Sequence, residues 1–231
     1  MSRKTPSPFS PALFKFLKEL AANNERDWFE ANRERYEADV REPALAFIHQ
    51  MEKPISRISP CFTAIAKKSG GSLMRVHRDV RFSKDKRPYK TNVGIQFRHT
   101  AGKDVHAPGW YLHLEPGQCF LGAGIWHPDA DTLRAIRSAI DSGPKNWKRV
   151  SADNGFRKIW EPAGDSLTRP PRGYEDDHRS IVDLKRKDHI AICKLTQAEI
   201  VASGFAEEVS RRYQAATPYV GWLTKTIGLP F

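Results

Sequence analysis

The sequence has few cysteines and no long hydrophobic run, and these absences exclude several classes of protein. Its three cysteines, Cys61, Cys119 and Cys193, lie far apart, and no two of them form a C-x-x-C pair. We therefore expect buried free thiols, without a disulfide framework or a structural zinc site. No apolar run approaches the roughly 20 residues that cross a bilayer, and the N-terminus lacks the apolar segment of a signal peptide. These features predict a cytoplasmic protein with no membrane partner.

Most short catalytic motifs are also missing. The sequence contains no G-x-x-x-x-G-K-[ST] phosphate loop, no G-x-S-x-G nucleophile elbow, no H-E-x-x-H and no P-C-x-x-C. The stretch LGAGIW from Leu121 has two glycines but lacks the third glycine and the strand-to-helix setting of a dinucleotide site. Its glycines are expected to serve close packing or a bulge. The sequence therefore names no cofactor and no reaction.

What the sequence does have is a large excess of positive charge. Lys and Arg number 38 against 27 Asp and Glu, which gives a formal net charge of +11. With 39% hydrophobic and 28% charged residues in 231, the composition is that of a globular protein. The charge favours anionic partners, either a phosphorylated small molecule or nucleic acid. The oligomeric state is left open.

Helical patterns occupy both ends of the chain. After a flexible tail of residues 1–8, Ser10 is placed as an N-cap with Pro11 at the first helical position. Further helices are expected around residues 28–40 and from Pro43, the latter disturbed at Pro54. In the second half, a helix over 133–140 ends at a Gly-Pro pair.

Two more helices are expected near the C-terminus. Thr196 and Glu199 form a capping box ahead of one of them. Thr217 and Pro218 open the last short helix.

Strand patterns lie between these helices. Four runs alternate apolar and polar residues, Leu73–Phe82, Asn92–Arg98, Trp110–Glu115 and Gln118–Trp126, and another strand begins at His189. The third and fourth are joined by a Pro-Gly turn, which predicts an antiparallel meander. We predict a single α+β domain over residues 9–231, with a mostly antiparallel sheet covered by N-terminal and C-terminal helices.

The most unusual stretch is RVHRDVRFSKDKRPYK, residues 75–90, with seven Arg or Lys, two Asp and one His. Such a run can gather around an anion, with phosphate held by cations and backbone amides and a tyrosine stacking on a base or sugar. Arg78 falls on the apolar side of the predicted strand, so it must meet either a carboxylate or a ligand. The predicted ligand-binding residues are Arg75, Arg78, Arg81, Lys84, Lys86, Tyr89 and Lys90.

One face of the predicted sheet collects polar side chains. Strand alternation places five side chains on that face: His77 and Asp79 from one strand, His113 and Glu115 from another, and Gln96 from a third. Asp79, His77 and His113 are the candidate acids or bases for catalysis. The same face also suits a solvated sheet surface with cross-strand ion pairs, and the two His-x-acid pairs suit a metal only if the strands are in register.

Three segments together resemble the family known as domain of unknown function 2461. They are NNERDWFEANRERYEADVREP from Asn23, RDVRFSKDKRPYKTN from Arg78, and GWYLHLEPGQCFLGAGIWHP from Gly109. The resemblance extends from about Phe9 to the C-terminus and implies one domain. It implies no activity, since the family has none to transfer.

The working hypothesis from the sequence is a cytoplasmic protein that binds an anionic, phosphate-bearing ligand at the basic strand and loop. Two other functions stay open: a non-enzymatic nucleic-acid-binding protein, and a hydrolase or transferase for a phosphorylated substrate. A purely structural alternative is that Arg78, Asp79, Arg81 and Asp85 form an internal ion-pair network that fixes the loop.

Overall fold

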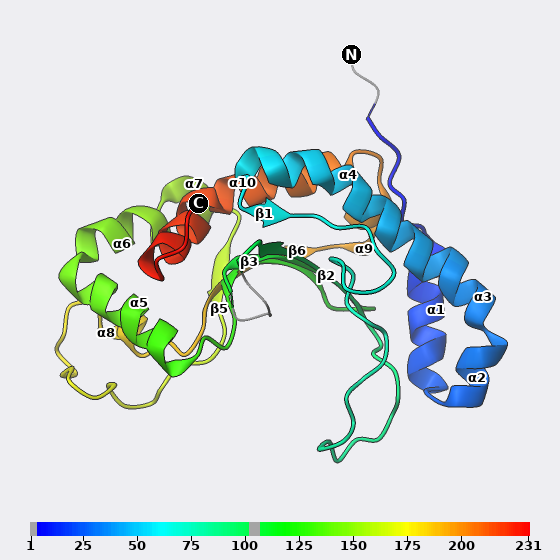
Figure 1. Cartoon of the computed structure of the whole chain (residues 1–231), viewed down its shortest axis with the longest axis horizontal. Coiled ribbons are helices and arrows are strands. Elements are labelled where there is room, and N and C mark those ends of the chain that lie inside the picture. The colour runs from blue at the N-terminus through cyan, green and yellow to red at the C-terminus, as the bar shows by residue number, and fades with distance from the viewer. Residues whose placement is uncertain (1–3, 102–106) are drawn as a thin grey trace.

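The protein is an α+β fold built on one six-stranded antiparallel sheet, as the sequence predicts (Figure 1). The structure is a computed structural model that describes residues 4–101 and 107–231. The strand order is β1-β2-β3-β4-β6-β5. The strands are β1 (Phe62–Thr63), β2 (Val93–His99), β3 (Gly109–Leu114), β4 (Cys119–Ile125), β5 (Glu161–Ala163) and β6 (His189–Leu195). The sheet is curved, and long helices cross its convex side.

Helices occupy both ends of the chain and both ends of the molecule. The N-terminal helices are α1 (Pro11–Ala22), α2 (Arg26–Ala31), α3 (Arg33–Tyr36), a π-helical turn (Glu37–Arg41) and α4 (Glu42–Ile58). The C-terminal helices are α5 (Ala130–Ser142), α6 (Pro144–Ser151), α7 (Asn154–Arg157), α8 (Ile181–Leu184), α9 (Gln197–Val201) and α10 (Phe205–Thr226). In the part of the chain that the structure describes, no helix has the length and apolarity needed to cross a bilayer.

Local sequence signals set several helix ends. The Ser10 side chain accepts a hydrogen bond from the Ala12 amide and Pro11 opens α1, both as predicted. The capping box of Thr196 and Glu199 is present at the start of α9. Helix α5 ends at Gly143, again as predicted.

Two prolines do not break their helices, contrary to expectation. Helix α4 continues past Pro54 to Ile58, and α10 runs through Pro218 instead of beginning there. In α10 the neighbours Ala216, Tyr219 and Val220 are buried. Burial of an apolar face outweighs the local cost of one lost backbone hydrogen bond, which is about 3 kcal/mol for an interior proline.

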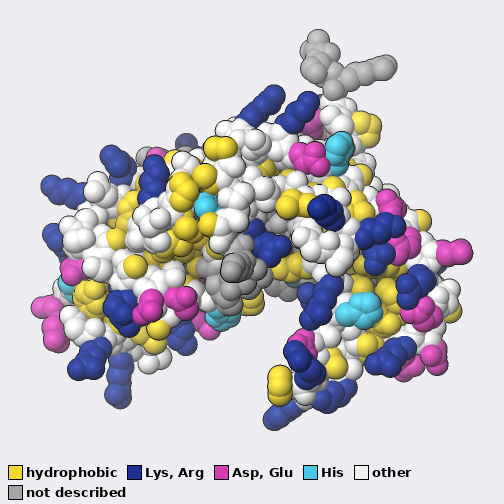
Figure 2. Space-filling model, viewed as in Figure 1, with side chains coloured by type: hydrophobic (Ala, Val, Ile, Leu, Met, Phe, Trp, Pro, Cys, Tyr) yellow, Lys and Arg dark blue, Asp and Glu magenta, His cyan; other side chains and the backbone are white. Residues whose placement is uncertain are grey.

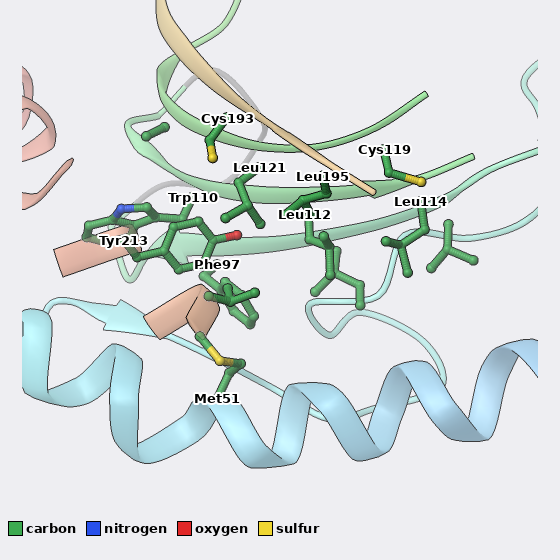
Figure 3. Close-up of a cluster of buried hydrophobic side chains, with 14 of the residues drawn as sticks. Met51, Phe97, Trp110, Leu112, Leu114, Cys119, Leu121, Cys193, Leu195 and Tyr213 are labelled. Atoms are coloured by element: carbon green, nitrogen blue, oxygen red, sulfur yellow. The ribbon is translucent and has the colours of Figure 1, made fainter. Parts of the chain in front are cut away.

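The hydrophobic core lies between the convex face of the sheet and helices α4 and α10 (Figure 3). Phe97, Trp110 and Leu112 point to this face and are fully buried, as strand alternation predicts. Met51 of α4 and Tyr213 of α10 pack against them, and the Tyr213 hydroxyl donates to a β3 carbonyl at 2.9 Å. The opposite, concave face therefore receives the alternate side chains of β2, β3, β4 and β6.

The stretch Leu73–Phe82 is not a strand, which corrects the prediction. It contributes only single bridges, Leu73 with Ile95 and His77 with Tyr89. Beyond Val76 its backbone has no sheet neighbour and bonds only to the returning chain, as in Lys90 N to Val76 O at 2.8 Å. Residues 75–90 thus form a two-sided projection, called here the arm, which stands out beside β2 and the N-terminal helices (Figure 1).

The N-terminal residues are attached to the C-terminal half of the chain. Of the eight residues expected to form a flexible tail, Met1–Arg3 lie outside the described residues. The Thr5 amide donates to Glu207 at 3.3 Å, and the Ser7 hydroxyl donates to the Ile200 carbonyl at 2.6 Å. These bonds connect the start of the chain to α9 and α10.

The three cysteines are free thiols, as predicted from their spacing. Cys119 and Cys193 are buried, whereas Cys61 is only half-buried.

Candidate ligand-binding site

A cavity of about 480 Å³ opens on the concave face of the sheet. Its walls are mostly apolar, with side chains from four strands and from the segment before the arm. The apolar walls include Met74, Phe120, Trp126, Ile190 and Ile192. The polar lining residues are Lys90, Asn92, Gln96, Tyr111 and His113. A largely apolar hollow with a few convergent polar groups is the usual form of a small-molecule site.

Strand pairing brings the polar residues together. Gln96 of β2 lies opposite Tyr111 of β3, and Gly94 lies opposite His113. Because alternate residues of a strand share a face, Tyr111 and His113 both project toward the cavity. The sequence placed these side chains on one polar face, and the register confirms it.

Tyr111, His113 and Glu115 form a hydrogen-bonded chain beside the cavity, which Tyr111 and His113 line. The Tyr111 hydroxyl lies 3.0 Å from His113 Nδ1, and His113 Nε2 lies 3.2 Å from Glu115 Oε2. The other Glu115 oxygen accepts a hydrogen bond from the Thr91 hydroxyl at 2.9 Å. Phe120 stacks on the imidazole with ring centroids 4.7 Å apart. The histidine is therefore held in one orientation from three sides.

The chemistry of this chain follows from its donors and acceptors. Glu115 can only accept while ionised, so the proton of a neutral His113 lies on Nε2, and Nδ1 accepts from the tyrosine. Burial, with the nearby Glu115 charge, raises the pKa of Tyr111 to about 12. Tyr111 thus keeps its proton at neutral pH and acts as a hydrogen-bond donor.

Among the described residues that line the cavity, Lys90 is the cation. Its side chain is half-buried, and burial, followed by the charge of Arg75, lowers the pKa of its ammonium group. Within residues 4–101 and 107–231 the Lys90 side chain makes no ion pair or hydrogen bond. A partly desolvated ammonium group without a counter-ion is an unfavourable arrangement that a bound anion would relieve.

Glycines lie in and beside the wall of the cavity. A Cβ atom at Gly94 would lie 2.7 Å from the Tyr111 hydroxyl oxygen, which is too close for a carbon. Gly122, in the LGAGIW stretch, also lines the cavity. Gly124 must be glycine because of its backbone. Its φ is +119°, which other residues rarely adopt, and an added Cβ would lie 2.1 Å from the His189 carbonyl oxygen.

The arginines of the arm do not surround the cavity. The Arg78 guanidinium donates to Asp85 at 2.7 Å, and Arg87 binds the same carboxylate at 2.7 Å. Arg81 pairs with Asp79 at 2.7 Å. These hydrogen bonds lower the pKa of Asp79 to about 2, and that of Asp85 is held well below its usual range. The arrangement is the internal ion-pair network that the sequence left open as an alternative.

Most other predicted residues of the arm also lie apart from the cavity, which Lys90 lines at the end of the arm. Lys84 and Lys86 are exposed near its tip, and the Lys86 ammonium donates to the Val80 carbonyl at 3.0 Å. Figure 2 shows dark blue Lys and Arg side chains along this projection, at the lower right. Arg75, His77 and Asp79 are exposed as well. Of the ten predicted site residues, Lys90 and His113 alone line the cavity as the structure describes it.

Tyr89 has a structural position that differs from the predicted role in stacking on a ligand. It is 4% exposed, and its ring stacks on Phe29 with centroids 4.0 Å apart. The side chain of Asn24 binds both the amide and the carbonyl of Tyr89 at 3.0 Å. These contacts fasten the base of the arm to the N-terminal helices, and they leave no ring face for a ligand on the Phe29 side.

The sequence-based selection missed Tyr111, Asn92 and Gln96 as site residues. The signal was present, because Tyr111 lies two residues before His113 and so shares its face. The two His-x-acid pairs considered for a metal are separated, with one pair on the arm and one at the cavity. Among the residues that the structure describes, no three His, Cys, Asp or Glu side chains are grouped closely enough to hold a metal ion.

The comparison with protein-family models gives a match. A family model described as "Conserved hypothetical protein (DUF2461)" matches residues 12–222. That range includes the arm and the cavity residues from Met74 to Ile192. No curated protein matches the chain.

Proposed function

Because the chain belongs to the DUF2461 family of conserved hypothetical proteins, whose description names no activity, we propose a function from the site alone. The concave cavity binds a small molecule that has an apolar body and one anionic group, such as a carboxylate or a phosphate ester. The observation that carries this proposal is Lys90, a half-buried cation that lies at the polar end of an apolar cavity and has no counter-ion within residues 4–101 and 107–231.

The two ends of the cavity fit the two parts of such a ligand. Apolar walls from Phe120, Trp126 and Ile192 favour a hydrocarbon or aromatic body, at about 25 cal/mol for each Å² removed from water. At the other end Lys90 supplies a charge, while the amides of Asn92 and Gln96 supply donors. The anionic ligand expected from the sequence is retained, but its proposed location moves from the arm to the sheet.

A pair of fluorescent probes tests this proposal. 8-Anilinonaphthalene-1-sulfonate has an aromatic body and one anionic group, and N-phenyl-1-naphthylamine has the same body without the charge. We expect both to bind, and Lys90→Met to weaken the sulfonate roughly tenfold, since a charge-assisted contact contributes about 1.5–3 kcal/mol before solvent screening. The neutral probe controls for the apolar walls and should keep its affinity. Equal loss of both probes, or loss of neither, would contradict the role of Lys90.

A second variant tests the location. Gly122→Leu places a side chain in the cavity that Gly122 lines, and its Cβ would make an ordinary contact with Tyr111 Cβ at 3.4 Å. Affinity for both probes should fall at least tenfold while the melting temperature stays within a few degrees of the wild type. Unchanged probe binding in a folded Gly122→Leu protein would place the probes elsewhere and overturn the proposed site.

A second candidate function is catalysis on the bound ligand, and the Tyr111–His113–Glu115 chain favours it. If His113 accepts a proton, the neighbouring Glu115 stabilises the imidazolium, which is the arrangement of a general base with an orienting carboxylate. Release of nitrophenolate from p-nitrophenyl phosphate measures hydrolase activity directly. We expect His113→Gln to abolish any turnover while the fluorescent probes still bind, whereas turnover that survives this change would exclude His113 as the base.

A further inference from the structure

The tip of the arm presents one aromatic ring to solvent. Phe82 is 95% exposed, which is more than any other large hydrophobic residue in the described part of the chain. The guanidinium of Arg81 lies 5.8 Å from the centroid of the ring. The sequence pattern had assigned Phe82 to the apolar side of a strand, so this exposure is a finding of the structure. A single exposed apolar residue is common, and its setting must decide whether it has a role.

The setting is a braced projection. Backbone hydrogen bonds join its two sides, including Arg78 N to Pro88 O at 2.8 Å. Asp85 holds Arg78 and Arg87 together, and the Asn24 side chain fastens the base at Tyr89. The two sides of the arm are therefore braced below the tip, which limits the backbone ordering that binding at the tip requires.

The charge around the ring is positive. The arm has seven Arg or Lys and two Asp, a net charge of +5 out of the +11 of the whole chain, which leaves +6 on the remainder. The two Asp carboxylates are occupied by arginines. Lys84 and Lys86 have no carboxylate partner within the ranges 4–101 and 107–231, so their charges are available to a polyanion.

We propose that the arm binds single-stranded nucleic acid, with Phe82 stacking on an unpaired base and Lys84 and Lys86 contacting the flanking phosphates. An exposed ring beside cations is the arrangement by which single strands are held without sequence preference. The +6 outside the arm allows a long polyanion further contacts, as a strand would make. This proposal concerns a different surface from the cavity and does not rest on the function proposed for it.

An anionic membrane is the competing partner for a basic tip with an exposed ring. Membrane attachment grows with buried apolar area, and the tip offers one ring with the ionised carboxylate of Asp79 only three residues away. Stacking on a base needs only one face of the ring and leaves the neighbouring polar groups in water. The observations therefore favour the nucleic acid.

Fluorescence anisotropy with a labelled dT20 oligonucleotide tests the proposal. We expect salt-sensitive binding by the wild type, and a loss of about 5- to 100-fold in affinity for Phe82→Ser, the range found when one base loses its stacking partner. Val182→Ser is the matched control, because Val182 is an exposed apolar residue, 74% exposed, in the other half of the chain. It should bind dT20 as the wild type does. Equal affinities for the two variants would overturn the stacking role.

The salt dependence tests the charges separately. Changing both Lys84 and Lys86 to Gln should reduce the slope of log affinity against log salt by about 1.4, at roughly 0.7 per phosphate on a single strand. The same change at the exposed Lys145 and Lys148 of α6 is the control and should leave the slope unaltered. Binding to vesicles of phosphatidylglycerol and phosphatidylcholine is the last measurement. Phe82-dependent binding to vesicles without binding to dT20 would assign the arm to membranes and refute the proposal.

Discussion

The arm and the cavity use positive charge in opposite ways. The arm has seven of the chain's 38 Lys and Arg residues within 16 positions, yet Arg78, Arg81 and Arg87 are all paired with its own two aspartates. Lys90, the last residue of the arm, lines the cavity and has no counter-ion among the described residues. The two aspartates of the arm thus engage three of its arginines, while Arg75, Lys84 and Lys86 stay exposed to water. Lys90 differs from these cations because it is partly desolvated where the chain enters the sheet.

The arm and the cavity also differ in how far their charged groups are exposed to solvent. The ion pairs of the arm are largely exposed, where a pair contributes about 0–1 kcal/mol and orients side chains more than it stabilises them. Lys90 is half-buried, where the same charge is desolvated and interacts more strongly with a partner. One lysine at the cavity is therefore worth more to a ligand than several arginines at the tip of the arm.

The base of the arm connects the two regions, and breaking it should have the largest effect. Asn24→Ala removes a buried side chain that binds both the amide and the carbonyl of Tyr89, the residue before Lys90. Two buried backbone groups are left without partners, so we expect a loss of about 2–4 kcal/mol in the free energy of unfolding. Because Lys90 also loses its support, affinity for the sulfonate probe should fall as well. Urea titration and probe binding measure the two effects.

The neighbouring asparagine provides the control for this prediction. Asn23 is exposed, and its side chain binds only the Glu19 carbonyl within the turn after α1. Asn23→Ala should cost less than 1 kcal/mol and leave probe binding intact. If Asn24→Ala lowers stability but not probe affinity, the arm and the cavity are independent, and the position of Lys90 is set by the sheet alone.

Local patterns in the sequence were sufficient for the fold class and for the faces of the central strands, but they placed only Lys90 and His113 of the ten predicted site residues at the cavity. The alternation of residues 93–98 and 110–114 set the register of faces correctly, because a buried sheet face permits only one parity. The stretch Leu73–Phe82 alternates equally well but has no strand beside it for most of its length. A strand needs a neighbour to satisfy its backbone, and the sequence of one segment does not show whether a neighbour is present.

The burial of two aromatic residues was also predicted wrongly, because it depends on contacts that one segment of sequence does not show. Tyr89 looked accessible because it stands among polar residues, yet it is buried against Phe29, sixty positions earlier in the chain. Phe82 looked buried because of its parity, yet it is 95% exposed. Contacts between distant segments decide such cases, whereas the position of His113 at the cavity follows from the alternation of its own strand.

A smaller effect is expected from breaking one ion pair of the arm. Arg78 is the least exposed arginine of the network, with 26% of its side chain accessible, and it also donates to the Arg87 carbonyl at 3.1 Å. Arg78→Ala should lower the free energy of unfolding by about 0.5–1 kcal/mol and leave the affinity for the sulfonate probe unchanged. Arg134→Ala removes the fully surface-exposed pair with Asp131 and should cost less. If Arg78→Ala loses probe binding, the anion-binding site lies on the arm, as the sequence predicts, and not in the cavity.

The smallest expected effect concerns the protonation of Asp79, the carboxylate that pairs with Arg81 in the arm. The hydrogen bonds from Arg81 lower the pKa of Asp79 from 3.8 to about 2. Because the folded-state pKa lies below the unfolded one, the contribution of this pair to stability is complete above pH 3.8 and is lost as the pH falls through about 2. The side-chain carboxyl resonance of Asp79, followed by NMR, should therefore titrate with a midpoint near 2 in the wild type and at a higher pH in Arg81→Ala, still below 3.8 because the backbone amide of residue 81 continues to donate to Asp79. A wild-type midpoint near 3.8 would mean that the arginine is not held by Asp79, and that the arm offers a ligand more positive charge than the structure assigns to it.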